Sequence, residues 1–157
     1  MVNQNIVFDL MGVLLVKALN PVTHQPEYRP VNFNEVIKLL KACKNANNGL
    51  YILSNLSVET YDRIKDEPEI ASLFSFFDGM IISGMTPYEK PDPRIFSIFC
   101  NTFHLVPETV IFIDDKLENC LSAQTIGINR TINCEEFNLV QIAEQLLDFG
   151  ALSNESE

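Results

Sequence analysis

The sequence predicts an α/β protein, a three-layer, doubly wound domain whose helices cover both faces of a parallel sheet. Short apolar runs alternate with longer amphipathic stretches, which is typical of parallel strands joined by right-handed helical crossovers. The apolar runs are continuous, as expected for strands buried on both faces. Three of these runs end in polar residues, at the edge of the sheet where ligands bind in open α/β folds.

The first predicted strand covers residues 6–8 and ends at Asp9. Burying an unpaired carboxylate costs several kcal/mol, so we place Asp9 at the open end of the strand. Gly12 allows the chain to turn sharply there. Residues 14–30 contain three X-Pro turn signals and predict a small hairpin flap over the strand end.

Asn32 is a candidate N-cap, with Glu35 as its capping-box partner, for an amphipathic helix that ends near residues 47–49. A second strand over residues 50–53 stops at Ser54 and Asn55. The remaining elements alternate in the same way: a helical stretch from Ser57 interrupted near Pro68, a strand over 80–83, a helix from Pro93 to His104 capped by Asp92, a strand over 110–113, a helix over 117–125, a strand over 128–132 and a helix over 139–149.

Composition restricts the partners and the compartment. A net charge of −10 over 157 residues, with no basic run, argues against nucleic acid and anionic membranes as partners. No apolar run approaches the roughly 20 residues of a membrane span, and the N-terminus lacks the basic region of a secretory signal, so we expect a cytoplasmic protein. We expect one domain over residues 1–152 and a disordered tail over 153–157.

The cysteines and histidines give no sign of a zinc site. The four cysteines (Cys43, Cys100, Cys120 and Cys134) show no C-x-x-C spacing, and in a cytosolic chain such scattered cysteines are usually small buried hydrophobic residues. His24 and His104 are far apart in the sequence and do not form a metal-ligand pair.

The polar residues that follow the strands have matching chemistry. Asp9 and the pair Asp114–Asp115 supply the oxygen ligands that a hard divalent cation such as Mg²⁺ prefers. Lys90 and the Ser54 hydroxyl are suited to hold the oxygens of a transferring phosphoryl group. Asp9 is then a candidate carboxylate nucleophile that forms an aspartyl-phosphate. Taken singly, Ser54–Asn55, Asp114–Asp115 and Lys90 are more often helix caps, turn residues or solvated loop residues.

Four motifs in order resemble the haloacid dehalogenase-like (HAD) superfamily. They are F-D-L-M-G-V at residues 8–13, L-S-N at 53–55, K-P-D-P at 90–93 and F-I-D-D-x-x-x-N at 112–119, and their spacing fits from about residue 6 to residue 132. The resemblance implies a Rossmann-like fold with a five-stranded parallel sheet in the order 3-2-1-4-5. The flap at residues 14–30 leaves little or no room for a cap domain.

The resemblance also implies a role for each matching residue. Asp9 is the expected nucleophile, and Ser54 and Lys90 the expected phosphate ligands, with Asn55 beside them in the substrate site. The expected magnesium ligands are Asp9, Asp114 and the main-chain carbonyl of Met11. Asp115 and Asn119 are expected to support the metal from the second shell or nearby.

One position departs from the pattern of the family's phosphatases. They usually carry a second Asp two residues after the nucleophile, as general acid and then general base, and here that position is Met11. Losing such a group typically costs about 10²–10⁴ in rate. Haloacid-cleaving members also lack this Asp, but they lose the acidic pattern that Asp114 and Asp115 retain. Phosphonate-cleaving members use a cap-domain lysine, for which this chain has little room.

We therefore expect a Mg²⁺-dependent phosphate-monoester hydrolase, slowed or specialised by Met11. The alternative is a catalytically inactive regulatory domain that keeps the metal and phosphate site. A phospho-accepting receiver domain fits poorly, because its acidic pair follows the first strand. The expected partner is a small phosphorylated molecule or a phosphorylated macromolecule. The sequence also allows a homo-oligomer, with Phe74, Phe76 and Phe77 as candidate contacts if they are exposed.

Overall fold

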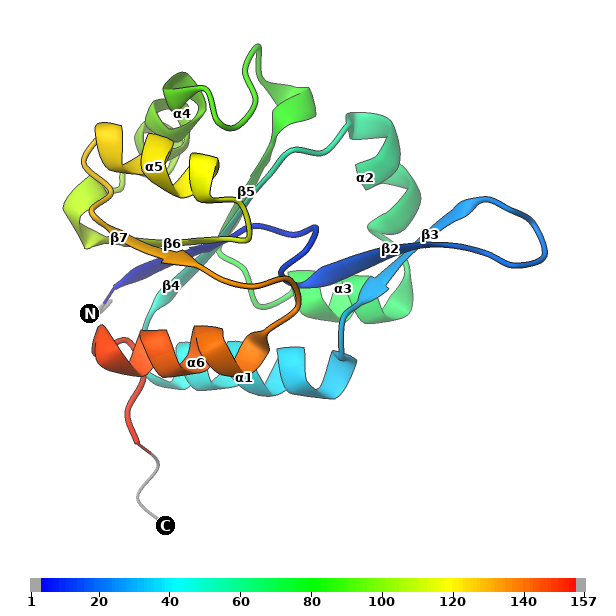
Figure 1. Ribbon diagram of the computed structural model, residues 1–157, viewed down its shortest axis with the longest axis horizontal. Coiled ribbons are helices and arrows are strands. Elements are labelled where there is room, and N and C mark those ends of the chain that lie inside the picture. The colour runs from blue at the N-terminus through cyan, green and yellow to red at the C-terminus, as the bar shows by residue number, and fades with distance from the viewer. Residues whose placement is uncertain (1–3, 155–157) are drawn as a thin grey trace.

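The computed structural model describes residues 4–154 and has five parallel strands at its centre (Figure 1). The strands are β1 (Asn5–Phe8), β4 (Gly49–Ser54), β5 (Gly79–Ile82), β6 (Val110–Asp114) and β7 (Arg130–Asn133), in the order β5-β4-β1-β6-β7. Renumbered within the sheet, this is the predicted order 3-2-1-4-5, which is therefore confirmed. The central strand β1 pairs with both β4 and β6, so the ends of β1 and β6 are neighbours.

The predicted flap is a two-stranded antiparallel hairpin. It consists of β2 (Leu15–Leu19) and β3 (Pro26–Pro30), and Figure 1 shows it extending away from the sheet. The hairpin follows the carboxyl end of β1 directly, with Leu15 buried at its base and Leu19 and Val22 exposed near its tip. Among the described residues, the hairpin is the only regular structure between β1 and the first helix.

Helices cover both faces of the sheet, as predicted (Figure 1). On one face, α4 (Pro93–Phe103) and α5 (Leu117–Thr125) pack through a cluster that includes Val7, Phe96 and Phe112. On the other face, a second cluster that includes Ile6 and Phe8 takes in the remaining helices: α1 (Phe33–Asn45), α2 (Val58–Ile64), α3 (Pro68–Phe74) and α6 (Leu139–Asp148). Two 3₁₀ turns, η1 (Ser83–Met85) and η2 (Pro107–Thr109), complete the elements.

Local signals account for several helix starts. The Asn32 side chain accepts a hydrogen bond from the Glu35 amide at 3.2 Å, which makes it the N-cap of α1 as predicted. Asp92 caps α4 by accepting from the Arg94 amide at 3.0 Å, with Pro93 at the first helical position. Ser57 caps α2 in the same way.

Two differences between the structure and the predicted element boundaries have a clear local cause. The last strand begins at Arg130 rather than at 128, because Gly127, with φ +99°, and the residues that follow it complete the turn out of α5. Pro68 does not merely interrupt a helix. It starts the separate helix α3 at its first position.

Burial confirms one expectation and removes the basis for another. All four cysteines are buried free thiols, as predicted. Three phenylalanines were candidate oligomer contacts on the condition that they are exposed. Instead, Phe74, Phe76 and Phe77 are half-buried against the core.

Two expectations concern the ends of the chain and the membrane. The predicted disordered tail, residues 153–157, falls partly on 155–157, which lie outside the described residues. Among the helices of residues 4–154, none combines the length and hydrophobicity needed to cross a bilayer.

Candidate active site

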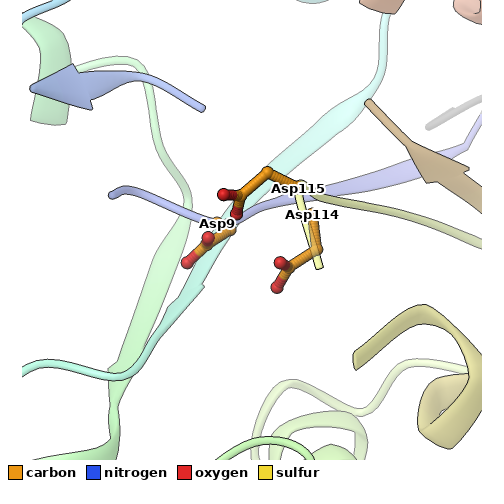
Figure 2. A group of neighbouring side chains, drawn as sticks. All are labelled: Asp9, Asp114 and Asp115. Atoms are coloured by element: carbon orange, nitrogen blue, oxygen red, sulfur yellow. The ribbon is translucent and has the colours of Figure 1, made fainter. Parts of the chain in front are cut away.

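Three aspartates meet at the carboxyl edge of the sheet. Asp9 follows β1, Asp114 ends β6 and Asp115 comes next in the chain, and Figure 2 shows the three side chains gathered at these strand ends. One carboxylate oxygen from each lies within 4.8 Å of the others. Asp114 is fully buried and Asp9 is 7% exposed. Residues more than 100 positions apart in the sequence are thus brought together, as the strand-end prediction required.

Lys90 is buried between two of these carboxylates. Its Nζ lies 2.9 Å from Asp9 Oδ1 and 2.8 Å from Asp114 Oδ2, and it also donates to the Leu53 carbonyl at 2.9 Å. The side chain is only 1% exposed. Buried charges of this kind are stable only when they are paired and hydrogen-bonded, and here all three donors of the ammonium are used.

Further hydrogen bonds fix the Asp114 carboxylate. Its Oδ1 accepts from the Lys116 amide at 2.9 Å, and its Oδ2 accepts from Asn119 Nδ2 at 3.0 Å. Asn119 lies in the first turn of α5 and is almost fully buried. The β6–α5 turn and Asn119 of the helix therefore orient the Asp114 carboxylate.

Electrostatics at the cluster reflect burial and crowding. Burial raises the pKa of Asp9 to about 7, and the Lys90 ammonium only partly offsets this increase. Burial and the neighbouring Asp114 also raise the pKa of Asp115. For Lys90, burial lowers the pKa, but Asp9 and Asp114 outweigh it and the pKa is raised. One ammonium is thus too little positive charge for three clustered carboxylates.

The cluster has the donor set of a divalent-cation site. When ionised, Asp9, Asp114 and Asp115 carry three negative charges against the one positive charge of Lys90, which leaves a net charge of −2. Asp115 Oδ1 is buried without a hydrogen-bond partner, as expected for an atom whose partner is an ion. All of these ligands are oxygens, which hard cations such as Mg²⁺ prefer.

The second predicted motif lies beside the cluster. Ser54 is fully buried, and its Oγ has no hydrogen-bond partner. Asn55 accepts from the Lys90 amide at 2.8 Å and donates to the Lys90 carbonyl at 2.9 Å, so it fixes the backbone that carries the lysine. Asn55 lines the cavity described next, whereas Ser54 does not.

A cavity of about 310 Å³ opens over the cluster. It is lined by residues from five separate segments of the chain: Asp9, Met11, Gly12, Leu15, Lys17, Asn55, Lys90, Asp115, Lys116, Asn119, Glu136 and Phe137. Met11 is half-buried in its wall, so the residue found where an acid was expected faces the site.

Six of the lining residues were not predicted as site residues: Gly12, Leu15, Lys17, Lys116, Glu136 and Phe137. Lys116 directly follows the acidic pair, and Glu136 and Phe137 follow the last strand. The rule that selected Asp9 and Asp114 therefore also applied to the end of β7, where it was not used. No local signal marked Lys17, because its place in the cavity wall depends on how the hairpin leaves the end of the sheet.

Comparison with known proteins agrees with this geometry. The family model described as haloacid dehalogenase-like hydrolase matches residues 27–127. A sesquiterpene phosphatase from Aspergillus oryzae is 27% identical over 90 residues, which are 57% of this chain and 44% of that protein. A drimenol cyclase from Aspergillus calidoustus is 27% identical over 100 residues, 64% of this chain and 18% of that protein. The matches thus span less than half of either curated relative.

Solved structures share the fold over nearly the whole chain. An uncharacterised protein from Corynebacterium glutamicum has a TM-score of 0.70 at 22% identity, covering 98% of this chain and 99% of its own. A HAD family enzyme from Bacteroides thetaiotaomicron was solved as a magnesium complex. It has a TM-score of 0.69 at 18% identity, and the match covers 85% of this chain and 93% of that enzyme's chain. The fold and the matched family model lead to one conclusion: the chain belongs to the haloacid dehalogenase-like hydrolase family.

Proposed function

We propose that the protein is a magnesium-dependent phosphate-monoester hydrolase that acts through an aspartyl-phosphate on Asp9. The observation that carries this proposal is the cluster of three carboxylates at the strand ends, two of them buried and paired with Lys90, with a cavity open over them. Its net charge of −2 matches a divalent cation, and the cation together with the lysine would offset the charge of a bound phosphate.

Each residue has a distinct task in this reaction. Asp9 attacks phosphorus with one carboxylate oxygen while Lys90 holds the other, Oδ1, at 2.9 Å. Lys90, by exchanging one of its three hydrogen bonds, and the buried, unpaired Ser54 hydroxyl would hold phosphoryl oxygens, and Asn55 keeps the lysine in place.

Asp9, Asp114 and the Met11 carbonyl would hold Mg²⁺, as the resemblance implies. We add Asp115 as a ligand because its carboxylate belongs to the cluster and has an unpaired oxygen, and Asn119 orients Asp114. When bound, the ion neutralises charge on the phosphoryl oxygens.

Relatives support a phosphorylated small molecule as the substrate. The Aspergillus oryzae relative is named a sesquiterpene phosphatase. The Bacteroides thetaiotaomicron enzyme was also solved with magnesium and inorganic phosphate. A cavity of about 310 Å³ matches a small molecule in size.

The test is turnover of p-nitrophenyl phosphate with Mg²⁺. We expect hydrolysis that is lost with EDTA and restored by added Mg²⁺. Asp9→Asn should abolish it, because an amide is not a nucleophile for phosphorus. Asp66→Asn, at an exposed aspartate outside the cavity, is the matched control and should turn over normally. Stable phosphorylation of Asp9 by acetyl phosphate without hydrolysis would instead support the regulatory alternative.

A further inference from the structure

No residue named so far acts as the general acid and base of the proposed reaction. Cleavage of a phosphate monoester requires a proton for the leaving oxygen, and hydrolysis of the aspartyl-phosphate requires a base for the attacking water. Met11 stands in the cavity wall close to Asp9, and its thioether can neither donate nor accept that proton. A group elsewhere in the cavity must do so if the reaction is to run at a useful rate.

Among the described residues that line the cavity, three are acidic: Asp9, Asp115 and Glu136. Asp9 is the proposed nucleophile, and Asp115 belongs to the carboxylate cluster. Glu136 is neither the nucleophile nor a member of the carboxylate cluster. It is exposed, so its carboxyl group can exchange protons with solvent between the two half-reactions.

The backbone holds Glu136 next to the loop that carries Met11. The Phe137 amide donates to the Gly12 carbonyl at 2.9 Å, which ties the residue after Glu136 to the residue after Met11. On the other side, the Cys134 amide donates to the Asp114 carbonyl at 3.1 Å. The segment that carries Glu136 is therefore attached to both strand-end loops of the site.

The same segment is also constrained locally. Phe137 has φ +60°, in the left-handed region, and the Asn138 amide donates to the Glu135 carbonyl at 3.2 Å. Asn138 then caps α6 by accepting from the Gln141 amide. A turn held at this many points fixes the backbone position from which Glu136 reaches the cavity wall.

We propose that Glu136 is the general acid and base of the reaction, supplied from the β7–α6 turn in place of the residue missing at position 11. In the first step an Asp9 oxygen bonds to phosphorus, the bond from phosphorus to the ester oxygen breaks, and the Glu136 carboxyl proton passes to that oxygen. In the second step water bonds to phosphorus, its proton passes to the Glu136 carboxylate, and the bond from phosphorus to Asp9 breaks. This inference rests on the proposed function.

The test compares Glu136→Gln with the wild-type protein on p-nitrophenyl phosphate. Nitrophenolate leaves without a proton, so phosphorylation of Asp9 and kcat/KM should be nearly unchanged. Hydrolysis of the aspartyl-phosphate loses its base, so kcat should fall by about 10²–10⁴. We expect a burst of nitrophenol equal to the enzyme present and accumulation of phosphorylated Asp9, seen by intact mass. On phenyl phosphate, a poorer leaving group, kcat/KM should fall as well.

Two further variants separate catalysis from structure. Glu135→Gln changes the adjacent carboxylate, which does not line the cavity, and should behave like the wild type. Met11→Asp introduced into the Glu136→Gln protein should restore kcat, because its carboxylate supplies the base that hydrolysis of the aspartyl-phosphate then lacks. Unchanged unfolding temperatures in all three variants would show that the fold is intact.

The possible failures are distinguishable. If the wild type turns over and Glu136→Gln shows neither a burst nor a fall in kcat, the role of Glu136 is wrong and the hydrolase stands. The same holds if Glu135→Gln is impaired equally, since the effect would then belong to the turn as a whole. If the wild type hydrolyses no phosphate ester with Mg²⁺, the proposed function fails, and the role of Glu136 fails with it.

Discussion

Gly12 is a residue whose side chain must be absent for the site to form. It has φ +85°, and a Cβ built on it would lie 2.5 Å from Asp115 Oδ2 and 2.8 Å from Asp115 Cγ. Its carbonyl also accepts the Phe137 amide. The glycine thus allows two loops and one carboxylate to approach the same backbone.

We predict that Gly12→Ala displaces Asp115 and weakens Mg²⁺ binding by about 10–100-fold, the usual cost of disturbing the shell around a metal site. It should also lower the free energy of unfolding by about 1–2 kcal/mol, the cost of a left-handed residue with a Cβ. Isothermal titration with Mg²⁺ and urea denaturation measure the two effects. Gly150→Ala is the matched control, because φ is +74° and no atom lies within 4 Å of its Cβ. Equal Mg²⁺ affinity in the two variants would contradict the role given to Gly12.

At the scale of elements, sequence was informative where a local signal and a tertiary requirement coincided. Helix α5 was predicted at its observed limits, and the start of α4 was predicted correctly because Asp92 and Pro93 form a cap in the sequence itself. The residues from Ser57 to Phe77 carry no single period, and the separation into α2 and α3 was only partly anticipated.

The site residues also divide into those that a local sequence signal predicted and those that only tertiary packing places at the site. Asp9, Asp114 and Lys90 were found because each directly follows a strand or precedes a helix cap. Lys17 and Glu136 reach the cavity through the packing of a hairpin and a turn, which no pattern within their own segments encodes. Contacts of this kind depend on the assembled fold.

The cap of α1 gives a prediction at this scale. We expect Asn32→Ala to lower the free energy of unfolding by about 1 kcal/mol, because the Glu35 amide loses its acceptor at 3.2 Å. Asn34→Ala, two residues on and also exposed, changes the same residue type away from the cap position and should cost less. Urea denaturation of both variants measures the difference. Equal losses would contradict the capping role of Asn32, because Ala raises the helix propensity at position 34 and removes no cap there.

For the whole molecule, charge is distributed unevenly. The chain carries −10 overall, yet three of its eleven lysines and arginines line the one cavity over the cluster: Lys17, Lys90 and Lys116. An anionic phosphate is repelled by the molecule at a distance, whereas at the cavity the three lysines offset the three acidic lining residues, Asp9, Asp115 and Glu136. Added salt screens the long-range repulsion, so it should weaken phosphate binding less than it does in a protein with a basic surface.

The buried thiols report on the stability of the whole fold. Burial raises the pKa of Cys43 to about 12, and Cys120 and Cys134 likewise reach about 12, against an ordinary value near 9. A folded-state pKa above the unfolded value means that the unfolded chain releases these protons first. The stabilisation that the protonated buried thiols give to the folded state is therefore complete below about pH 9 and is lost as the pH rises toward 12.

We predict that the free energy of unfolding, measured by urea denaturation in reducing buffer, falls between pH 9 and pH 11. In Cys43→Ala the fall should be shallower by up to about 1.4 kcal/mol per pH unit, the contribution of one proton. An identical pH slope in the variant and the wild type would mean that the Cys43 thiol ionises as easily in the folded core as in the unfolded chain.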